Sequence, residues 1–231
     1  MCEGVRAVEE LLRSTLQPTG VLVAPQLLDA PRGAALRETL RQTGVSIEEV
    51  TAPEFHSAAE TESPQGVLAI APIPQRSFDD VAAEDGLRVL VLDAVQDPGN
   101  VGTILRTAAA LGVHATAALP GTVDLWNAKV VRSAMGAHFH HSCFASTWQA
   151  FDAFRERSGT MLWAADAAGT PVQDIAPPAR LALVVGNEGA GISDDARTRA
   201  AATVALPITA AVESLNVAVA TGILLFELRP R

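Results

Sequence analysis

An apolar strand that runs through a polar turn into an amphipathic helix, over residues 89–108, constrains this chain more than any other feature. Val89–Leu92 is a run of apolar residues, and Asp97-Pro98-Gly99-Asn100 is rich in turn formers. Beyond the turn, the apolar positions follow helical spacing: Val101, Ile104, Leu105 and Ala108. This spacing predicts a helix over 100–111 with one buried face, and we expect Asn100 to be its N-cap.

The opposite face of this helix carries small residues and one charge. Thr103, Thr107, Ala109 and Ala110 surround Arg106 there. A solvated helix face usually carries several charges, so we interpret this one as a packing surface whose guanidinium is kept for an anion. A surface salt bridge of Arg106 is the alternative interpretation.

Two later segments combine a strand with a polar turn. Leu183–Gly186 runs into Asn187-Glu188-Gly189, a glycine-containing turn with one carboxylate. Leu206-Pro207-Ile208 is a short strand, which is followed by a loop and a helix start over 213–220. Taken singly, the first segment is also typical of an ordinary strand-to-helix turn, and the second of a core strand.

Together and in this order, the three segments resemble the signature motifs of the SpoU-type RNA 2′-O-ribose methyltransferases of the SPOUT superfamily. The resemblance covers essentially the whole chain. It implies S-adenosylmethionine-dependent transfer of a methyl group to a ribose 2′-hydroxyl of structured RNA, ribosomal or transfer. It also implies a homodimer and an α/β-knot, in which the C-terminal segment threads a trefoil knot that general topology rules would argue against.

The resemblance assigns the polar residues of the motifs to catalysis. The residues implied are Asn100, Arg106, Glu188, Ser214 and Asn216. We expect Arg106 to anchor the substrate phosphate and orient the hydroxyl, because a guanidinium stays protonated and is a poor base. Ser214 also fits the role of a helix cap, whereas Asn216 is expected inside the first turn, where capping is less natural.

The motif loops are expected to hold the cofactor by backbone contacts, because glycine lets a ligand approach the main chain closely. The cofactor-binding residues implied are Gly186, Asn187, Gly189, Leu206, Ile208 and Leu215. Residues 127–137 resemble a further family segment. There Lys129 and Arg132 lie three residues apart on one helix face and are expected to contact RNA phosphates, with a merely solvated face as the alternative.

Strand and helix patterns alternate along the chain and predict an α/β protein of two domains. Residues 1–75 form a small α/β domain, which resembles the ribosomal-protein-like RNA-binding domain of the family. Residues 76–86, with an acidic cluster, are the expected linker. The strand and helix pattern of residues 87–231 predicts a parallel sheet with crossover helices. The resemblance implies that this part is the methyltransferase domain.

The expected elements are as follows. In the first domain, strands are expected at 21–24, 45–50 and 66–71, and helices at 3–12, 34–43 and 54–60. In the second, strands are expected at 88–93, 115–119, 138–144, 161–165, 181–185 and 203–206, and helices at 100–111, 126–134, 147–157, 192–200 and 214–228. The last helix is apolar nearly all round, which predicts burial on more than one side and makes it a candidate dimer interface.

Composition excludes several classes of protein. The 231 residues contain no run of about 18 apolar residues, so we expect no membrane span, and no secretory leader is visible. Two cysteines are too few for a disulfide framework and favour a cytoplasmic protein. The net charge of −9 argues against strong nonspecific nucleic-acid binding, but the acidity lies mainly before Gly86, so a local basic site after it is compatible with this composition.

Four residues invite a zinc interpretation: His138, His140, His141 and Cys143. In a strand, the first two share one face and the last two the other, so we predict no metal site. The chain also departs from the family pattern at two places, Thr209-Ala210-Ala211 and His140-His141, which bear on cofactor fit and RNA preference. Family chains often begin with a basic segment before Glu3-Gly4, so an upstream start or a shorter RNA-binding surface is expected.

Two alternatives come from other functional classes. One is a non-catalytic RNA-binding or ribosome-assembly factor on the same fold, which would not need all five polar motif residues. The other is a dinucleotide-dependent enzyme, which normally carries a G-x-G-x-x-G turn that this chain lacks. Neither the RNA nor the modified nucleotide follows from the sequence.

Overall fold

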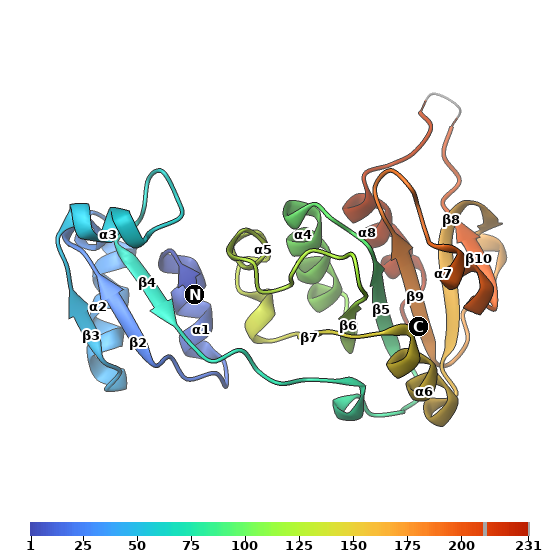
Figure 1. Cartoon of the computed structure of the whole chain (residues 1–231), viewed down its shortest axis with the longest axis horizontal. Helices are drawn as coiled ribbons and strands as arrows, with labels where there is room; N and C mark the ends of the chain where they lie inside the picture. The colour runs from blue at the N-terminus through green and yellow to red at the C-terminus, as the bar shows by residue number, and fades with distance from the viewer. Residues whose placement is uncertain (210–211, 231) are drawn as a thin grey trace. The chain divides into compact units, whose positions relative to one another are not determined.

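The structure is a computed structural model that describes residues 1–209 and 212–230, and it contains two compact units. Unit 1 comprises Met1–Pro74 and Met135–His140, and unit 2 comprises Gln75–Ala134 and His141–Arg231 (Figure 1). No helix in the described part of the chain is long and apolar enough to cross a membrane.

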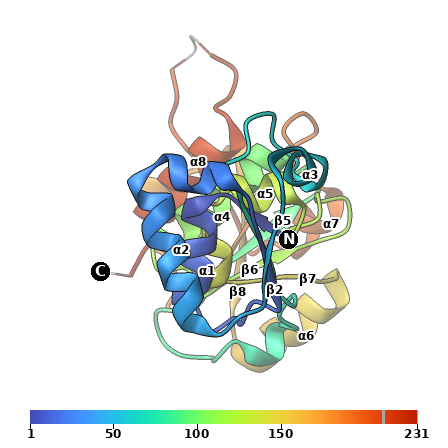
Figure 2. The same cartoon turned by 90° about the vertical axis from the view of Figure 1, so that its left-hand side faces the viewer.

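Unit 1 is built on a four-stranded mixed sheet. Its strand order is β1 (Cys2–Glu3), β4 (Val67–Ile70), β2 (Gly20–Val23) and β3 (Ile47–Glu49). Strand β4 runs antiparallel to both of its neighbours, and β2 runs parallel to β3. Helices α1 (Val5–Arg13) and α2 (Pro31–Thr43) lie side by side, and α3 (Ala52–Ala58) packs Phe55 against Leu68 on the other face of the sheet (Figure 2).

The first turn of α1 contacts the segment just before β4, and both places contain a glycine with an unusual backbone conformation. Gly4 (φ 98°) and Gly66 (φ 74°) have left-handed backbone conformations that favour glycine. The Gln65 Oε1 atom accepts a hydrogen bond from Val5 N at 2.9 Å, which satisfies an N–H group at the first turn of α1. The helix expected from residue 3 therefore begins at Val5, because Cys2–Glu3 pair with β4 as a strand.

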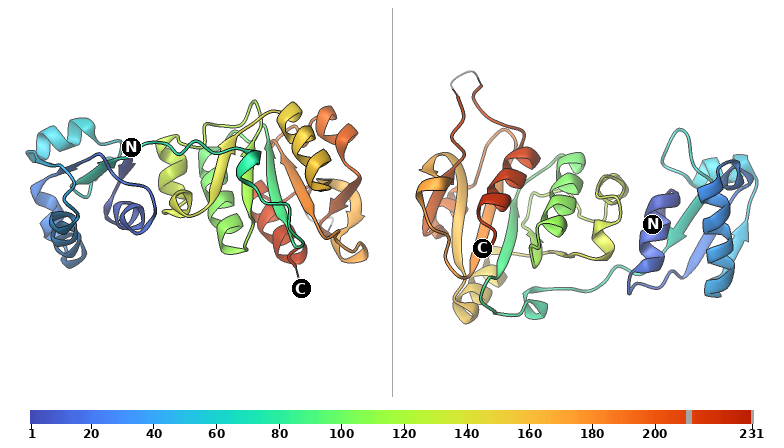
Figure 3. Two further views of the ribbon diagram at one scale, coloured as in Figure 1. Left: turned by 90° about the horizontal axis from the view of Figure 1, so that it is seen from below. Right: turned by 180° about the vertical axis from the view of Figure 1, so that it is seen from behind.

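Unit 2 is a six-stranded sheet in which all neighbouring strands are parallel. The order is β10 (Ala202–Ala205), β8 (Met161–Pro171), β9 (Leu181–Gly186), β5 (Arg88–Asp93), β6 (Ala115–Ala118) and β7 (Ser142–Ala145). One face carries α4 (Pro98–Ala110), α5 (Ala128–Ser133) and α8 (Val217–Glu227), and the other carries α6 (Trp148–Ser158) and α7 (Asp194–Arg199) (Figure 3). The predicted α/β class with a parallel sheet is confirmed, and the knot stays a prediction.

The segment expected to be a linker contributes to the core of unit 2. It contains the short 3-10 helix η2 (Phe78–Asp80), and the Phe78 ring lies 5.0 Å from that of Phe144 and 4.7 Å from that of Phe154 between centroids. Burial of an aromatic side chain of this size fixes the chain onto unit 2 before β5 begins. The division into domains at residues 75 and 87 stays a prediction.

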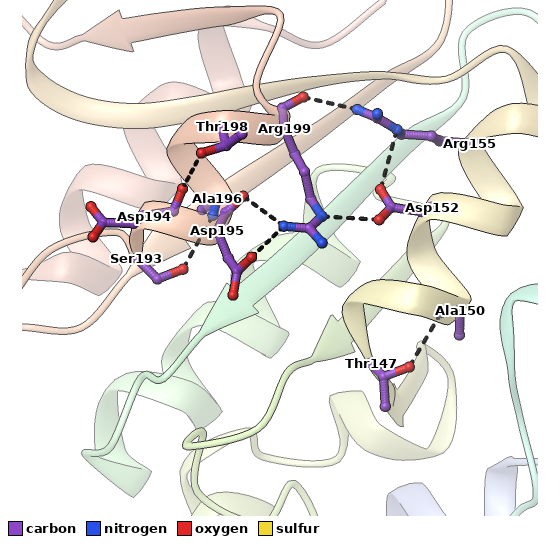
Figure 4. Close-up of polar contacts among 10 residues, drawn as sticks. All are labelled: Thr147, Ala150, Asp152, Arg155, Ser193, Asp194, Asp195, Ala196, Thr198 and Arg199. Atoms are coloured by element: carbon purple, nitrogen blue, oxygen red, sulfur yellow. Dashed lines mark hydrogen bonds and ion pairs between the residues drawn. The ribbon is translucent and has the colours of Figure 1, made fainter.

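Two arginines tie α7 to α6 (Figure 4). Arg199 Nε donates to Asp152 Oδ2 at 2.9 Å, and Arg199 Nη1 donates to Asp195 Oδ1 at 2.5 Å. Arg155 Nη1 donates in turn to the Arg199 carbonyl oxygen at 2.8 Å. Helix α7 follows closely on residues 187–191, which form the turn after β9. This network therefore fixes the chain just beyond that turn.

Strand β7 begins four residues later than predicted. Met135 (φ 51°) and Gly136 (φ 93°) both have left-handed backbone conformations, and residues 137–139 then form the 3-10 helix η3 (Ala137–Phe139). The prediction that His138 and His140 share a strand face is therefore wrong. Among the described residues, no group of three or more His, Cys, Asp or Glu side chains is placed to hold a metal ion.

The two cysteines, Cys2 and Cys143, are buried free thiols. Burial raises the pKa of each thiol to about 12, because the apolar surroundings disfavour the thiolate. Both sulfurs are therefore protonated thiols at neutral pH and are poor nucleophiles.

Candidate functional site

The candidate site lies where the two central strands of unit 2 end. Strands β5 and β9 are parallel neighbours, and their last residues, Asp93 and Gly186, are paired. The chain order also reverses here, since β6 and β7 extend the sheet on one side of β5 whereas β8 and β10 extend it beyond β9. Ligands of open parallel sheets bind outside the carboxyl ends of the strands at such a switch point.

The turn after β9 is held closed by Asn187. Its Oδ1 atom accepts from Gly189 N at 2.9 Å and from Ala190 N at 3.0 Å, and its Nδ2 atom donates to the Ala94 carbonyl oxygen at 2.9 Å. A Cβ atom on Gly186 would lie 2.2 Å from the Gly191 backbone, so only glycine fits there. The side chain of Asn187 therefore shapes the turn and joins it to the loop after β5.

Three residues from the three motifs form one chain of hydrogen bonds. Glu188 Oε1 accepts from Asn100 Nδ2 at 3.0 Å, and Asn100 Oδ1 accepts from Asn216 Nδ2 at 2.9 Å. The Glu188 carboxylate also accepts from two backbone N–H groups, those of Gln96 at 3.2 Å and Asp97 at 3.1 Å. The loops after β5 and β9 and the start of α8 are thereby fixed to one another.

Glu188 is held as a carboxylate by these donors. Desolvation raises its pKa, but the hydrogen bonds from the Asn100 side chain and from the backbone of Glu188, Gln96 and Asp97 together outweigh it and lower the pKa below 4.5. A carboxylate with a lowered pKa is a weak base. The arrangement therefore suits the positioning of Asn100 and the loop better than the removal of a proton.

Both helix caps in the motifs differ from the predictions. The N-cap of α4 is Asp97, whose Oδ1 accepts from Asn100 N at 2.8 Å, because Pro98 occupies the first helical position that proline favours. The N-cap of α8 is Asn216, which accepts from Ala218 N and Val219 N. The prediction that Asn216 lies inside the first turn is wrong, and Ser214 lies in the loop before the helix.

A pocket of about 580 Å³ opens beside the hydrogen-bonded chain. It is lined by all six residues expected to bind the cofactor, and also by Glu188, Ser214 and Asn216. Leu206, Ile208 and Leu215 supply an apolar wall, and the turn after β9 supplies main-chain groups. This size and this lining fit a nucleoside-sized ligand such as S-adenosylmethionine. Ala210 and Ala211, in the loop where the chain departs from the family pattern, lie outside the described residues.

Two charged residues of the pocket were not singled out in the sequence. Asp166 follows the part of β8 that pairs with β9, and Arg197 is on α7. Arg197 Nη1 lies 2.6 Å from Asp166 Oδ2. The sequence offered one signal for this pair: Asp166 is a carboxylate that directly follows the expected strand 161–165. Its partner Arg197 is too far away in sequence for the pair to form a local pattern.

Arg106 does not line this pocket, in contrast to Glu188, Ser214 and Asn216. It is exposed on α4 and lines a second pocket of about 470 Å³, together with Thr103, Thr107, Gly222 and Phe226. Packing of α4 against α8 brings the small residues predicted around Arg106 next to the last helix.

The part of the chain that the structure describes buries helix α8 on one side only. Its exposed face contains Val219, Ile223 and Phe226, whose exposed fractions are 52, 41 and 49%. Its buried face contains Ala218, Thr221, Leu224 and Leu225. The prediction of burial on several sides is thus not met by a single copy of the chain, and an apolar face is left open.

Lys129 and Arg132 are both exposed on α5. The helix packs closely against α4, where a Cβ atom on Gly102 would lie 2.6 Å from the Val130 carbonyl oxygen. The two cations are therefore presented on the same face of the sheet as α4, which begins at the site.

Two sequence families match the chain. The SpoU rRNA Methylase family matches residues 87–226, and the RNA 2′-O ribose methyltransferase substrate binding family matches residues 1–77. The chain is 34% identical to a 23S rRNA (guanosine(2553)-2′-O)-methyltransferase of Bacillus subtilis, over 99% of this chain and 88% of the relative. It is 31% identical to a 23S rRNA (guanosine-2′-O-)-methyltransferase of Haemophilus ducreyi, over 84% of this chain and 82% of the relative.

Solved structures with a similar fold contain bound S-adenosylmethionine (AdoMet). The SpoU methyltransferase AviRb of Streptomyces viridochromogenes in complex with AdoMet matches with a TM-score of 0.86 and 26% identity, over 98% of this chain and 88% of that chain. The AdoMet-bound rRNA methyltransferase of Sinorhizobium meliloti matches with a TM-score of 0.85 and 27% identity, over 98% and 85% of the two chains.

Proposed function

This chain belongs to the SpoU rRNA methylase family, and we propose that it methylates the ribose 2′-hydroxyl of a nucleotide in 23S ribosomal RNA. The reaction class is that of an S-adenosylmethionine-dependent RNA 2′-O-ribose methyltransferase. The ribosomal substrate is supported by the names of the two relatives, both of which are 23S rRNA guanosine methyltransferases.

One observation carries the assignment of the active site: the hydrogen-bonded chain from Glu188 through Asn100 to Asn216, at the edge of the pocket. Methyl transfer is an in-line displacement, which requires the methyl donor and the hydroxyl to be held in register. A chain of fixed polar groups beside a cofactor-sized pocket meets this requirement. A binding protein without catalysis would not need it.

When bound, S-adenosylmethionine supplies an electrophilic methyl group on sulfur. Leu206, Ile208 and Leu215 would cover the base and exclude water, and the turn at Gly186 and Gly189 would offer main-chain hydrogen bonds. These five residues and Asn187, which lines the same pocket, are the six expected from the sequence, and their contacts with the cofactor stay a prediction.

The polar residues have separate roles in this proposal. Glu188 and Asn216 position Asn100, whose side-chain oxygen and nitrogen are both engaged. Ser214 is exposed at the pocket, and in this proposal its hydroxyl contacts the substrate. Arg106 anchors the phosphate beside the reacting ribose, because a guanidinium binds phosphate in two-point contacts.

We further propose a cytoplasmic homodimer in which the open face of α8 and the adjoining face of α4 meet a second copy. Val219, Ile223 and Phe226 give α8 an apolar surface that an isolated helix face would not normally expose. Such a dimer would place Arg106 at the interface. The N-terminal domain and the exposed Lys129 and Arg132 would contact the RNA.

Methylation of defined transcripts tests the proposal. Unmodified 23S rRNA and unmodified tRNAs from the source organism are incubated with the full chain and tritiated S-adenosylmethionine, and the modified nucleotide is mapped. We expect incorporation into 23S rRNA at a ribose 2′-oxygen. Incorporation into tRNA alone would contradict the proposed substrate, and incorporation into neither would contradict the activity.

A further inference from the structure

The pocket has a second polar region, which the proposed catalytic roles do not use. Asp166 and Arg197 line it together with Ala165 and Ala167, at the place where β8 stops pairing with β9. The last such pair is Ala164 with Val184, two residues before Gly186. The Asp166 carboxylate therefore lies one strand away from the turn after β9, at the same edge of the sheet.

The Asp166 carboxylate is held in one orientation. Its Oδ1 atom accepts from Ala168 N at 2.9 Å, and its Oδ2 atom contacts Arg197 Nη1 at 2.6 Å. An ionised carboxylate offers about four lone-pair positions, so each oxygen has one position beyond these contacts. The side chain is 16% exposed and is one of the groups that line the pocket.

The surroundings also keep this group ionised. The hydrogen bond from Ala168 N and the neighbouring Arg197 guanidinium together outweigh desolvation and hold the pKa of Asp166 below 3.8. At neutral pH the side chain is consequently an acceptor only. It suits a ligand group that presents two donors side by side.

We propose that Asp166 accepts hydrogen bonds from the two ribose hydroxyls of the cofactor's adenosine, with Arg197 as the residue that positions the carboxylate. The inference rests on the proposed function, because it assumes that the cofactor occupies this pocket. A vicinal diol matches the two acceptor positions. In dinucleotide-binding proteins, a carboxylate binds a ribose hydroxyl by the same chemistry.

The alternative role for the pair is purely structural, as a tie between β8 and α7. The two roles differ in what they predict for a ligand that lacks the hydroxyls. A diol acceptor discriminates between ligands with and without hydroxyls, whereas a structural tie affects both ligands equally.

Calorimetry with S-adenosylhomocysteine and its 2′,3′-dideoxy counterpart separates these roles without any need for turnover. In the unaltered chain, we expect the dideoxy ligand to bind about 10- to 100-fold more weakly, as for one or two hydrogen bonds to a charged group. Asp166→Ala should weaken the binding of S-adenosylhomocysteine by a similar factor. It should weaken the binding of the dideoxy ligand by less than about twofold. Asp166→Asn, which keeps the size of the side chain, should give an intermediate loss for the first ligand only.

Asp194→Asn is the matched control, because Asp194 is an exposed carboxylate on α7, the helix that carries Arg197, but does not line the pocket. It should leave both affinities within about twofold. Equal affinity of the unaltered chain for the two ligands, or equal losses in Asp166→Ala, would overturn the role of Asp166 while leaving the pocket assignment intact. If the folded, unaltered chain bound neither ligand, the pocket assignment itself would be wrong and the inference would fail with it.

Discussion

The Glu188 carboxylate accepts a hydrogen bond from the Asn100 side-chain amide at 3.0 Å, although 88 residues separate the two in sequence. The same carboxylate accepts from the backbone N–H groups of Gln96 and Asp97. The Glu188 side chain therefore fixes both the start of α4 and the orientation of the Asn100 side chain on that helix. This relationship gives the first two predictions.

Glu188→Gln should slow methyl transfer by about 10- to 100-fold and leave cofactor affinity nearly unchanged. The amide offers one acceptor oxygen where the carboxylate offers two, so at least one donor in the loop loses its partner. Single-turnover rates and calorimetry with S-adenosylhomocysteine measure the two effects. Glu156→Gln on α6, outside the pocket, is the control, and a normal rate in Glu188→Gln would remove the positioning role.

The stabilising effect of Glu188 should depend on pH in one direction. Its folded-state pKa is lower than the usual 4.5, so its contribution to the free energy of unfolding is fully present above pH 4.5. It should be lost as the pH falls below 4.5 towards the folded-state pKa. Urea unfolding of the unaltered chain and of Glu188→Gln at several pH values measures this, and a stability difference that grows below pH 4.5 would contradict the sign.

Arg106→Ala should abolish most methyl transfer, by about a hundredfold or more, because the reacting hydroxyl loses its anchor. Cofactor affinity should stay nearly normal, since Arg106 lies outside the cofactor pocket. Dimerisation should also persist, because the apolar face of α8 that forms most of the proposed interface is unchanged. Arg106→Lys should restore little, because an ammonium cannot reproduce the guanidinium fork. The readout is radiolabelled methyl incorporation, with Arg157→Ala on α6 as the control, and lost cofactor binding would make Arg106 structural.

Ile223→Glu should convert the dimer to monomers and reduce activity with it. The change places a charge on the open apolar face of α8, where Ile223 is 41% exposed. Met161→Glu is the control, because Met161 has a similar exposure of 44% on β8. Sedimentation at micromolar concentration should give about twice 24.1 kDa for the unaltered chain and for the control. A fully active species of 24.1 kDa would rule out the proposed dimer.

Asn216 has two functions that substitutions can separate. Asn216→Asp keeps an oxygen for the Ala218 and Val219 N–H groups but loses the Nδ2 donor to Asn100. It should therefore retain stability and lose activity. Asn216→Ala should lose activity and in addition about 1 kcal/mol of stability, as for other N-caps. Thermal unfolding and methylation rates check both, and equal stability of the two variants would show that the cap contributes little.

The sequence predicted the two central strands of unit 2, β5 and β9, better than the helix starts in the motifs, for a physical reason. Strand β5 was expected over its observed bounds, because a strand buried on both faces is a continuous apolar run. In Asp97-Pro98-Gly99-Asn100, two residues can cap a helix, and the choice depends on where the chain turns. The same ambiguity affected Ser214 and Asn216.

The site was predictable as a set of motifs but not as a set of contacts. The resemblance selected Asn100, Glu188 and Asn216, yet their hydrogen-bonded chain depends on the sheet order that places β5 beside β9. Asp166 was missed because its significance comes from Arg197, 31 residues further on, and from the pocket that both line. Local patterns do not encode such tertiary contacts.

The bonds that close the turn after β9 determine when its conformational entropy is lost. Asn187 already satisfies the Gly189 and Ala190 N–H groups and is anchored to Ala94, and Gly186 packs against Gly191. The turn is therefore ordered during folding, and a ligand that arrives later has little main chain to immobilise there. Association should accordingly be fast and close to lock-and-key, with the cost of order already met by the fold.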